Sequence, residues 1–135
     1  MIQLTQVNLD SVSTELAAIF AIYETALMEN DLATLDQLFW QSSLTVRFGT
    51  SENLYGIDAI RAFRQVRNVD TLKRILRHTQ ITTYGEDFAT TTTEFIRVDQ
   101  LVGRQSQTWV RFAEGWRVVS AHVSLSQHVS LNKEM

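Results

Sequence analysis

Two side chains in the first half of the chain are candidates for chemistry on a small acid. Tyr23 lies in a stripe of apolar residues spaced three and four apart, and Arg47 lies in an alternating segment. A buried phenol needs a hydrogen-bond partner, and a buried guanidinium needs an anion. A backbone carbonyl and an acid such as Glu24, Glu52 or Glu94 can satisfy them without a ligand. A tyrosine beside an arginine can instead transfer a proton while the arginine binds a substrate carboxylate.

The alternation around Arg47 supports two opposed expectations. Leu44, Val46 and Phe48 share one face of the expected strand, and Arg47 lies on the other. If only the aliphatic face is covered, Arg47 lies in water. If both faces are covered, Arg47 enters a partly polar pocket on its own side. We expect the second arrangement, with a substrate carboxylate bound by the guanidinium in bidentate fashion.

Three arginines in the middle of the chain are further candidates for binding an acid. Arg61, Arg64 and Arg67 recur at three-residue spacing. This pattern is typical of a solvated helix face, and it also suits a positive rim that attracts a small dianion to a pocket. Among the three, we select Arg64 for contact with substrate.

The segment 104–109 is unusually polar for a buried strand. One face would carry Arg104, Ser106 and Thr108, and the other would carry Gln105, Gln107 and Trp109. Either face suits a polar ligand or a dimer interface, because amides and hydroxyls make the same hydrogen bonds in both settings.

His122 shares a predicted strand face with Trp116 and Val118. A histidine among apolar residues is typical of a satisfied core group, although an imidazole can also transfer protons near neutral pH. The candidate substrate-binding residues are therefore Trp40, Arg64, Arg104, Ser106, Gln107, Trp109 and His122.

The composition excludes several kinds of site. The 135 residues include no cysteine, so disulfides, thiolate metal ligands and cysteine nucleophiles are ruled out. The three histidines, His78, His122 and His128, lack ligand spacing, and we predict no metal. No glycine-rich phosphate loop and no Gly-x-Ser-x-Gly motif occurs, and we predict no cofactor.

Charge and hydropathy indicate the cellular setting. A net charge of -3 and a pI near 5.5 argue against binding to nucleic acid. No apolar run approaches the roughly 20 residues of a membrane span, and the chain does not begin with a signal-peptide pattern. We therefore expect a cytoplasmic protein without nucleic-acid or membrane partners.

The periodicity predicts an α+β fold in a single domain, residues 1–135, with 126–135 as a loose tail. The chain begins with a long amphipathic helix, which Asp10, Ser11 or Ser13 would cap. A short second helix, running on through Trp40, would be capped by Asn30 or Asp31.

The rest of the chain predicts mostly strands. An alternating strand, Leu44–Phe48, leads into a turn-like stretch, Gly49–Asn53. A third helix follows Gly56 and carries Arg61, Arg64 and Arg67. From about Leu72 onward, β-branched and aromatic residues predict four long antiparallel strands. The breaks between these strands fall at Tyr84–Asp87, Asp99–Gly103 and Glu114–Gly115.

Seven segments carry a resemblance to a known family. They are Leu38–Trp40, Thr45–Gly49, Glu52–Gly56, Ile60–Arg64, Tyr84–Ala89, Gly103–Trp109 and Ala121–Ser124. In this order they resemble the AtzH-like family, within the SnoaL-like branch of the nuclear-transport-factor-2-like superfamily. The resemblance runs from about residue 12 to residue 126. It implies a cystatin-like cone, in which N-terminal helices pack on a curved antiparallel sheet and enclose an internal pocket.

The resemblance also implies an activity. The family is associated with amidases of urea-derivative and cyanuric acid breakdown, and a member acts on 1,3-dicarboxyurea, which loses a carboxyl group to give allophanate. The family's catalytic pair, a tyrosine on the first helix and an arginine on the first strand, corresponds to Tyr23 and Arg47. Around this pair, Trp40, Trp109 and Trp116 would close the apolar wall of the pocket.

The expected partners follow from the same resemblance. They are a small anionic substrate such as a carboxylated urea, a second copy of the chain in a homodimer, and an amidase of the same pathway. The alternative function is a non-catalytic module, which would bind a small acid in the pocket and self-associate through the sheet face.

Overall fold

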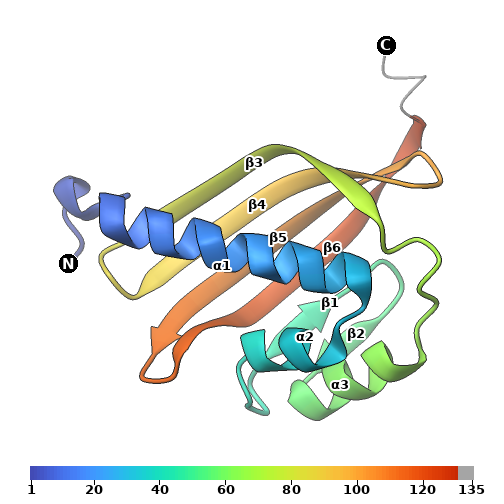
Figure 1. The fold of residues 1–135 in the computed structure, drawn as a ribbon, viewed down its shortest axis with the longest axis horizontal. Helices are drawn as coiled ribbons and strands as arrows, with labels where there is room; N and C mark the ends of the chain where they lie inside the picture. Colours follow the sequence, from blue (N-terminus) through green and yellow to red (C-terminus); the bar gives the residue numbers. More distant parts are fainter. Residues whose placement is uncertain (131–135) are drawn as a thin grey trace.

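The computed structural model describes the backbone of residues 1–130 and the side chains of residues 1–126. The described chain contains, in order, η1 (Leu4–Gln6), α1 (Asp10–Glu29), α2 (Leu32–Leu38), β1 (Val46–Phe48), β2 (Asn53–Tyr55), α3 (Ile57–Val66), β3 (Arg74–Tyr84), β4 (Phe88–Arg97), β5 (Leu101–Phe112) and β6 (Gly115–Ser130). The predicted α+β fold is confirmed, with α1 lying across the long strands (Figure 1).

The start of α1 differs from the prediction. The helix begins at Asp10, and its N-cap is Leu9, which provides no side-chain hydrogen bond. Asp10, Ser11 and Ser13 therefore lie inside the first turn and do not act as caps. The carboxylate of Asp10 is favourable there, because the positive end of the helix dipole lies at the N-terminus.

Asp31 caps α2, as predicted. Asn30 ends α1 in the left-handed conformation, with φ of 53°, and the next carboxylate accepts hydrogen bonds from the Thr34 hydroxyl at 2.7 Å and from the Thr34 backbone N–H at 3.2 Å. These hydrogen bonds lower the pKa of Asp31. The helix ends at Leu38, so the predicted extension through Trp40 is wrong.

The strand order of the sheet is β2–β1–β6–β5–β4–β3. Neighbouring strands are antiparallel except β1 and β6, which run parallel and place Arg47 beside Ala121. The four long strands are separated at the three predicted places, although Tyr84, Leu101–Gly103 and Gly115, which we expected in the breaks, belong to strands. The predicted strand Leu44–Phe48 is shortened to Val46–Phe48, and the short β2 is not predicted because it follows directly on a turn-like stretch.

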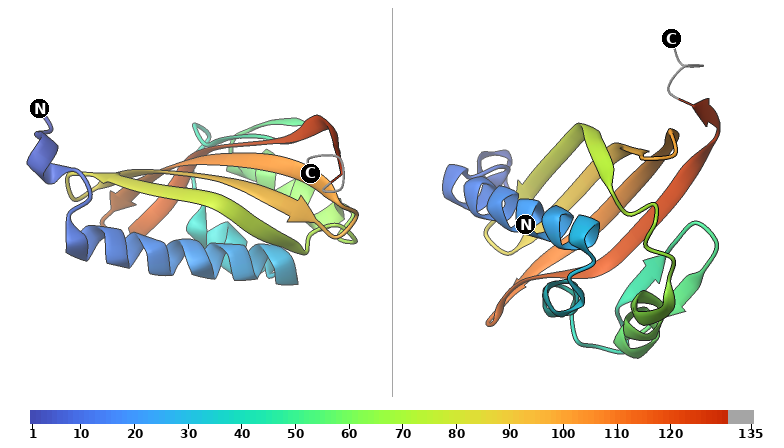
Figure 2. Two further views of the ribbon diagram at one scale, coloured as in Figure 1. Left: turned by 90° about the horizontal axis from the view of Figure 1, so that it is seen from above. Right: turned by 45° about the vertical axis from the view of Figure 1, so that its right-hand side comes forward.

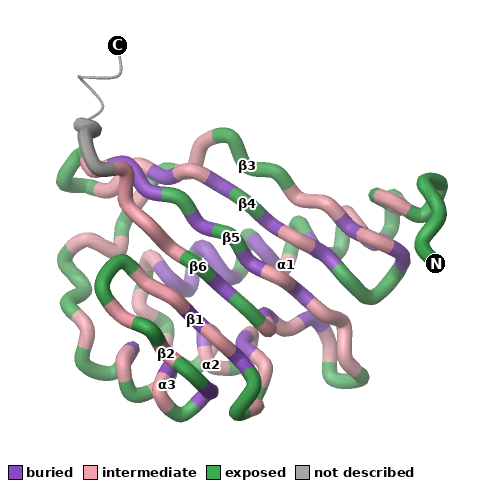
Figure 3. The backbone as a smooth tube through the Cα atoms, turned by 180° about the vertical axis from the view of Figure 1, so that it is seen from behind, coloured by how far each residue is buried: buried purple, intermediate pink, exposed green. Residues whose placement is uncertain are grey.

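The core lies between α1 and the face of the curved sheet against which the helix packs (Figure 2). Its most buried side chains come from the three α-helices, the residue after α2, and β4, β5 and β6; they are Leu16, Leu35, Phe39, Ile60, Ala89, Trp109, Trp116 and Val118. Figure 3 shows the opposite face of the sheet, where exposed and buried residues alternate along the strands.

A β-bulge in β6 changes which residues face the helices. Thr108 pairs with Ser120, whereas the next residue of β5, Trp109, pairs with Val118, so Val119 is an extra residue in β6. Before the bulge, Trp116 and Val118 are buried on the helix side. After the bulge, the odd-numbered positions take that side.

His122 therefore lies on the opposite face of the sheet from Trp116 and Val118. Its side chain is exposed, whereas its neighbour Ala121 is buried. The prediction that the histidine shares a strand face with these two residues is wrong, because one inserted residue reverses the alternation of side chains.

The strand β6 continues to Ser130 and thus includes the first part of the segment 126–135, for which we expected a loose tail. The rest of that expectation, residues 131–135, lies outside the described residues. Within the described part of the chain, no helix is long and apolar enough to span a membrane.

Candidate functional site

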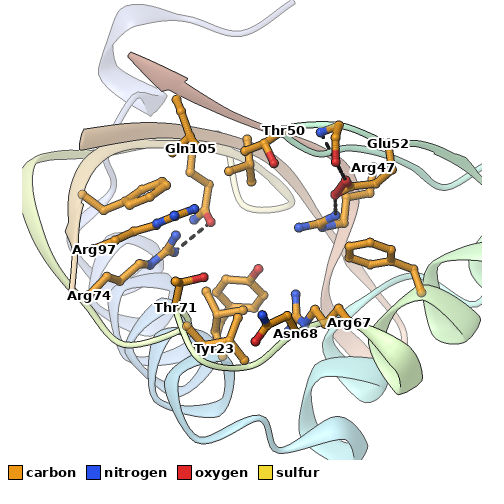
Figure 4. Close-up of a pocket in the computed structure, with 17 residues that line it drawn as sticks. Tyr23, Arg47, Thr50, Glu52, Arg67, Asn68, Thr71, Arg74, Arg97 and Gln105 are labelled. Atoms are coloured by element: carbon orange, nitrogen blue, oxygen red, sulfur yellow. Dashed lines mark hydrogen bonds and ion pairs between the residues drawn. The ribbon is translucent and has the colours of Figure 1, made fainter. Parts of the chain in front are cut away.

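A cavity of about 270 Å³ lies between α1, the segment that follows α3, and the helix-covered face of the sheet (Figure 4). Its lining residues are Tyr23, Leu27, Arg47, Thr50, Ser51, Glu52, Phe63, Arg67, Asn68, Thr71, Leu72, Arg74, Phe95, Arg97, Gln105, Val123 and Leu125. The lining combines four arginines with a tyrosine and several apolar side chains, which suits a small anionic ligand.

Tyr23 projects its hydroxyl from α1 into this cavity (Figure 4). The residue is 3% exposed, and its ring lies edge-on to Trp109 and beside Phe39, with centroid distances of 6.3 and 6.2 Å. Trp109 is itself fixed by a 3.2 Å hydrogen bond from Nε1 to the Thr91 hydroxyl. None of the described residues forms a hydrogen bond with the Tyr23 hydroxyl, so this group is available to a ligand.

Arg47 enters the cavity from β1 and is 8% exposed. Its Nη1 donates to Glu52 Oε1 at 3.2 Å, and its guanidinium carbon lies 5.3 Å from the centre of the Phe63 ring. On the other face of β1, Phe48 packs edge-on against His122. The strand is thus partly covered on both faces, as expected, although Leu44, which precedes it, is 72% exposed.

Glu52 reaches Arg47 because residue 49 is a glycine. A Cβ at Gly49 would lie 1.7 Å from Glu52 Oε1, which no side chain can accommodate without displacing the carboxylate. The second carboxylate oxygen accepts hydrogen bonds from the backbone N–H and the hydroxyl of Ser51, both at 3.2 Å. The carboxylate therefore bridges the loop after β1 to the cavity arginine.

Arg74 forms a second, more deeply buried ion pair on the opposite wall, with Glu24 of α1. Its Nε lies 3.1 Å from Glu24 Oε2, its Nη2 donates to Gln105 Oε1 at 2.8 Å, and its guanidinium lies over the Phe95 ring at 4.4 Å. The sequence prediction does not include Arg74 or Gln105 in the site. Glu24 was the available signal for this ion pair. It lies beside the apolar stripe of the first helix, and a buried acid there needs a cationic partner.

The three arginines predicted to share one helix occupy three different environments. Arg61 pairs with Asp36 and Asp58 near the surface. Arg64, our candidate for substrate contact, is 4% exposed but does not line this cavity. Arg67, three residues later, does line it.

Burial lowers the pKa values of Arg64 and Arg67. It lowers the pKa of Arg64 to about 10, and the nearby charges of Arg47 and Arg67 act in the same direction, against opposing contributions from Tyr23 and Asp36. The Arg64 guanidinium lies 4.2 Å from the centre of the Phe39 ring. Burial, followed by the charge of Arg47, also lowers the pKa of Arg67.

The remaining predicted residues do not line the cavity. Arg104 and Ser106 are exposed on the same face as His122, and Arg104 Nε donates to the Ser124 hydroxyl at 3.2 Å. Gln107 is buried, and its Oε1 accepts a hydrogen bond from Thr91 at 3.1 Å.

The three tryptophans that we expected to close the pocket wall lie outside the lining as well. Trp109 supports the ring of Tyr23 from behind. Trp40 stacks on Phe112 at 5.2 Å, and Trp116 donates to Glu15 at 2.9 Å. The apolar part of the pocket wall is formed instead by Phe63, Phe95 and aliphatic residues. Among the described residues, no group of three or more histidine, aspartate or glutamate side chains is placed to hold a metal ion.

Two solved structures resemble this chain in both sequence and fold. A crystal structure of a protein of unknown function from Pectobacterium atrosepticum, assigned to the DUF3225 family, is 52% identical, with a TM-score of 0.92 over 94% of this chain and 100% of that one. A cystatin-like fold protein from Burkholderia xenovorans is 44% identical, with a TM-score of 0.87 over 91% and 98% of the two chains.

A more distant structure shows the fold alone. A nuclear-transport-factor-2-like protein from Salmonella enterica is 24% identical, with a TM-score of 0.71 over 91% of this chain and 96% of that one. Comparison with curated protein sequences finds no match. The profile of the AtzH-like family matches residues 5–129. The protein therefore belongs to the AtzH-like family, and it has a cystatin-like fold that is shared by a nuclear-transport-factor-2-like protein.

Proposed function

We propose that the protein is a cofactor-independent enzyme that removes a carboxyl group from a small carboxylated urea, such as 1,3-dicarboxyurea. The observation that carries this proposal is the convergence of the Tyr23 hydroxyl and the Arg47 guanidinium on one arginine-rich cavity. A phenol can deliver a proton and an arginine can hold a carboxylate, which together meet the chemical needs of this reaction.

The size of the cavity favours a small acid. Its volume of about 270 Å³ falls just below the roughly 300–1,000 Å³ of pockets that hold drug-sized ligands. Low exposure of Tyr23 and Arg47 strengthens their interactions with an anion, because water competes less for the charges.

The reaction needs one proton and no redox partner. Arg47 holds the carboxylate that is retained, and Tyr23 donates its proton to the nitrogen that bears the departing carboxyl group. The bond between this nitrogen and the carboxyl carbon breaks, the electron pair stays on nitrogen, and carbon dioxide leaves. Tyr23 then regains a proton from water.

Two other readings of the same site lead to different products. In the first, Arg47 would bind the substrate in the same way, water would hydrolyse the amide bond as the nucleophile, and carbon dioxide would be released afterwards. Binding of the acid without turnover is the second candidate function, because the lining offers more anion-binding groups than proton-transfer groups. Association with an amidase of the same pathway remains a proposal for either function.

The test measures binding and carbon dioxide release side by side with a panel of ureido- and carbamoyl-carboxylates. Arg47→Ala should weaken binding at least about tenfold, because a buried charge-assisted contact is lost. Tyr23→Phe should abolish release while binding changes by less than about threefold, because only the hydroxyl is removed. Arg111→Ala and Tyr55→Phe serve as matched controls, since Arg111 pairs with Asp87 outside the cavity and Tyr55 is 65% exposed.

Retained release by Tyr23→Phe would rule out the proton-donor role. Binding that depends on Arg47 without any release by the wild type would favour the non-catalytic function. Formation of an amine product before carbon dioxide would favour amide hydrolysis.

A further inference from the structure

Arg67 presents a guanidinium to the cavity and has no hydrogen-bond or ion-pair partner among the described residues. The residue directly follows α3, where its extended backbone is anchored by a 3.0 Å hydrogen bond from its N–H to the Phe63 carbonyl. Its side chain reaches the same space as Tyr23 and Arg47 (Figure 4). Its Nε and Nη2 atoms are inaccessible to solvent and make no hydrogen bond.

The other arginines of the lining are each neutralised by a carboxylate. Arg47 pairs with Glu52, Arg74 with Glu24, and Arg97 with Asp99. Within the described part of the chain, Arg67 is the lining arginine that has no such partner. The cavity and its acidic neighbours thus hold one excess positive charge, located on Arg67.

An unpartnered guanidinium in this position is costly to the folded protein. Arg67 is half-buried, and its Nε and Nη2 atoms lose their hydrogen bonds to water without gaining a partner among the described residues. Arg64 shows the contrasting case, since it also lacks hydrogen bonds on two nitrogens but lies over the Phe39 ring outside the lining. For Arg67, an anion bound in the cavity is the group that can compensate the charge.

We propose that Arg67 binds a second carboxylate of the ligand and makes the site selective for small dicarboxylates over monocarboxylates. This inference rests on the proposed function, because it assigns the second acid group of the same substrate. Arg47 uses Nη1 for Glu52, and a guanidinium has five N–H donors, so Arg47 retains donors for the first carboxylate. Arg67 is then the specificity-determining residue.

The test compares two stable ligands that differ by one charge. Glutarate carries two carboxylates separated by three atoms, as in a dicarboxylated urea, and its half-amide glutaramate replaces one carboxylate with a neutral group of similar size. Calorimetric titration should show that the wild type prefers glutarate about tenfold or more. Arg67→Met should reduce this preference to below about threefold and leave glutaramate binding almost unchanged.

Matched variants separate binding from structure. Arg67→Lys should restore part of the preference, because it restores the charge without the planar fork of donors. Arg111→Met, which removes an arginine outside the cavity, should keep the full preference. An unchanged preference in a folded Arg67→Met, shown by its circular dichroism spectrum, would overturn the inference.

Failure of this inference is distinguishable from failure of the proposed function. A dicarboxylate preference that depends on Arg67, without carbon dioxide release from any carboxylated urea, would keep the inference and contradict the enzyme proposal. Release by the wild type that Arg67→Met leaves unchanged in KM and kcat would contradict the inference alone.

Discussion

Glu52 governs how many donors Arg47 can offer to a ligand. Its carboxylate lies 3.2 Å from Nη1 of Arg47 and is held in place by two hydrogen bonds from Ser51. A substrate carboxylate would approach the same guanidinium, so the two anions repel each other and share the available N–H groups. Glu52 therefore neutralises Arg47 in the free protein, and we expect it to weaken binding of an acid.

Removing this charge should strengthen binding. We expect Glu52→Gln to lower the Kd for glutarate about threefold to tenfold, because the amide keeps the size of the side chain and eliminates the repulsion. Isothermal titration calorimetry measures the change. Glu94→Gln is the matched control, since Glu94 pairs with Arg77 outside the cavity lining and its loss should leave the Kd unchanged. Weaker binding by Glu52→Gln would mean that Glu52 positions Arg47.

At the residue scale, the sequence predicted only part of the site. The part that it missed, Arg67, depends on the backbone conformation at the end of α3. The resemblance placed Tyr23 and Arg47 together, and the structure shows both in one cavity. We expected Arg64 and Arg67 on the same helix and selected Arg64 for contact with substrate. The helix stops at Val66, so the next residue has an extended backbone and a new side-chain direction. Helix ends are uncertain by a residue or two from sequence, and here one residue separates the environments.

At the scale of elements, α3 carries two arginines with opposite effects on the stability of the fold. Arg61 stabilises the surface through ion pairs, whereas Arg64 is buried with two unpartnered nitrogens. Burial lowers the pKa of Arg64 from its ordinary value to about 10, which corresponds to about 3 kcal/mol of lost folding free energy. The cost is complete below pH 10 and declines above it, because the folded chain releases the proton before the unfolded chain does.

Replacing the buried charge with an apolar side chain should stabilise this element. We expect Arg64→Met to raise the free energy of unfolding at pH 7 by about 1–3 kcal/mol, because methionine keeps contact with Phe39 and needs no anion. Urea denaturation followed by circular dichroism gives the value. Arg61→Met should change stability by less than about 1 kcal/mol, since its ion pairs are partly exposed. A loss of stability in Arg64→Met would show that the cation itself supports the fold.

The strands were predicted more securely than the faces that they present. β-branched residues and clear breaks identify four long strands, and all four are confirmed. The bulge at Val119 has no comparable signature, because the extra residue is an ordinary strand former. One such insertion moved His122 to the face opposite Trp116 and Val118. Alternation therefore predicts a face only as far as the nearest bulge.

On the scale of the whole molecule, the sheet face away from α1 carries exposed polar side chains such as Arg104, Ser106 and His122. Cross-strand pairs of this kind can form an interface as readily as they contact water. Homodimerisation through this face stays a prediction. In such a dimer the two faces of the sheet would have different roles, since one face lines the cavity and the other would contact a second copy of the chain.

Light scattering after size-exclusion chromatography tests the dimer. We expect the wild type to elute with about twice the mass of one chain. Introducing acids at the centre of the face, as Ser106→Glu with His122→Glu, should yield the monomer, because like charges would face each other across a two-fold axis. Gln37→Glu, on an exposed position of α2, should leave the dimer intact. A wild type that is monomeric at all concentrations would contradict the prediction.

The cavity also has a consequence for how the chain folds. Tyr23, Arg47, Arg67 and Gln105 reach it from α1, β1, the segment after α3, and β5, so its wall joins residues from most of the chain. Contacts this distant in sequence carry a large loop-closure entropy and form late. A chain that has not yet added its last strands to the sheet therefore has no binding site. Ligand binding consequently reports complete folding, and a destabilising substitution far from the cavity should lower the number of active molecules without changing the affinity of each.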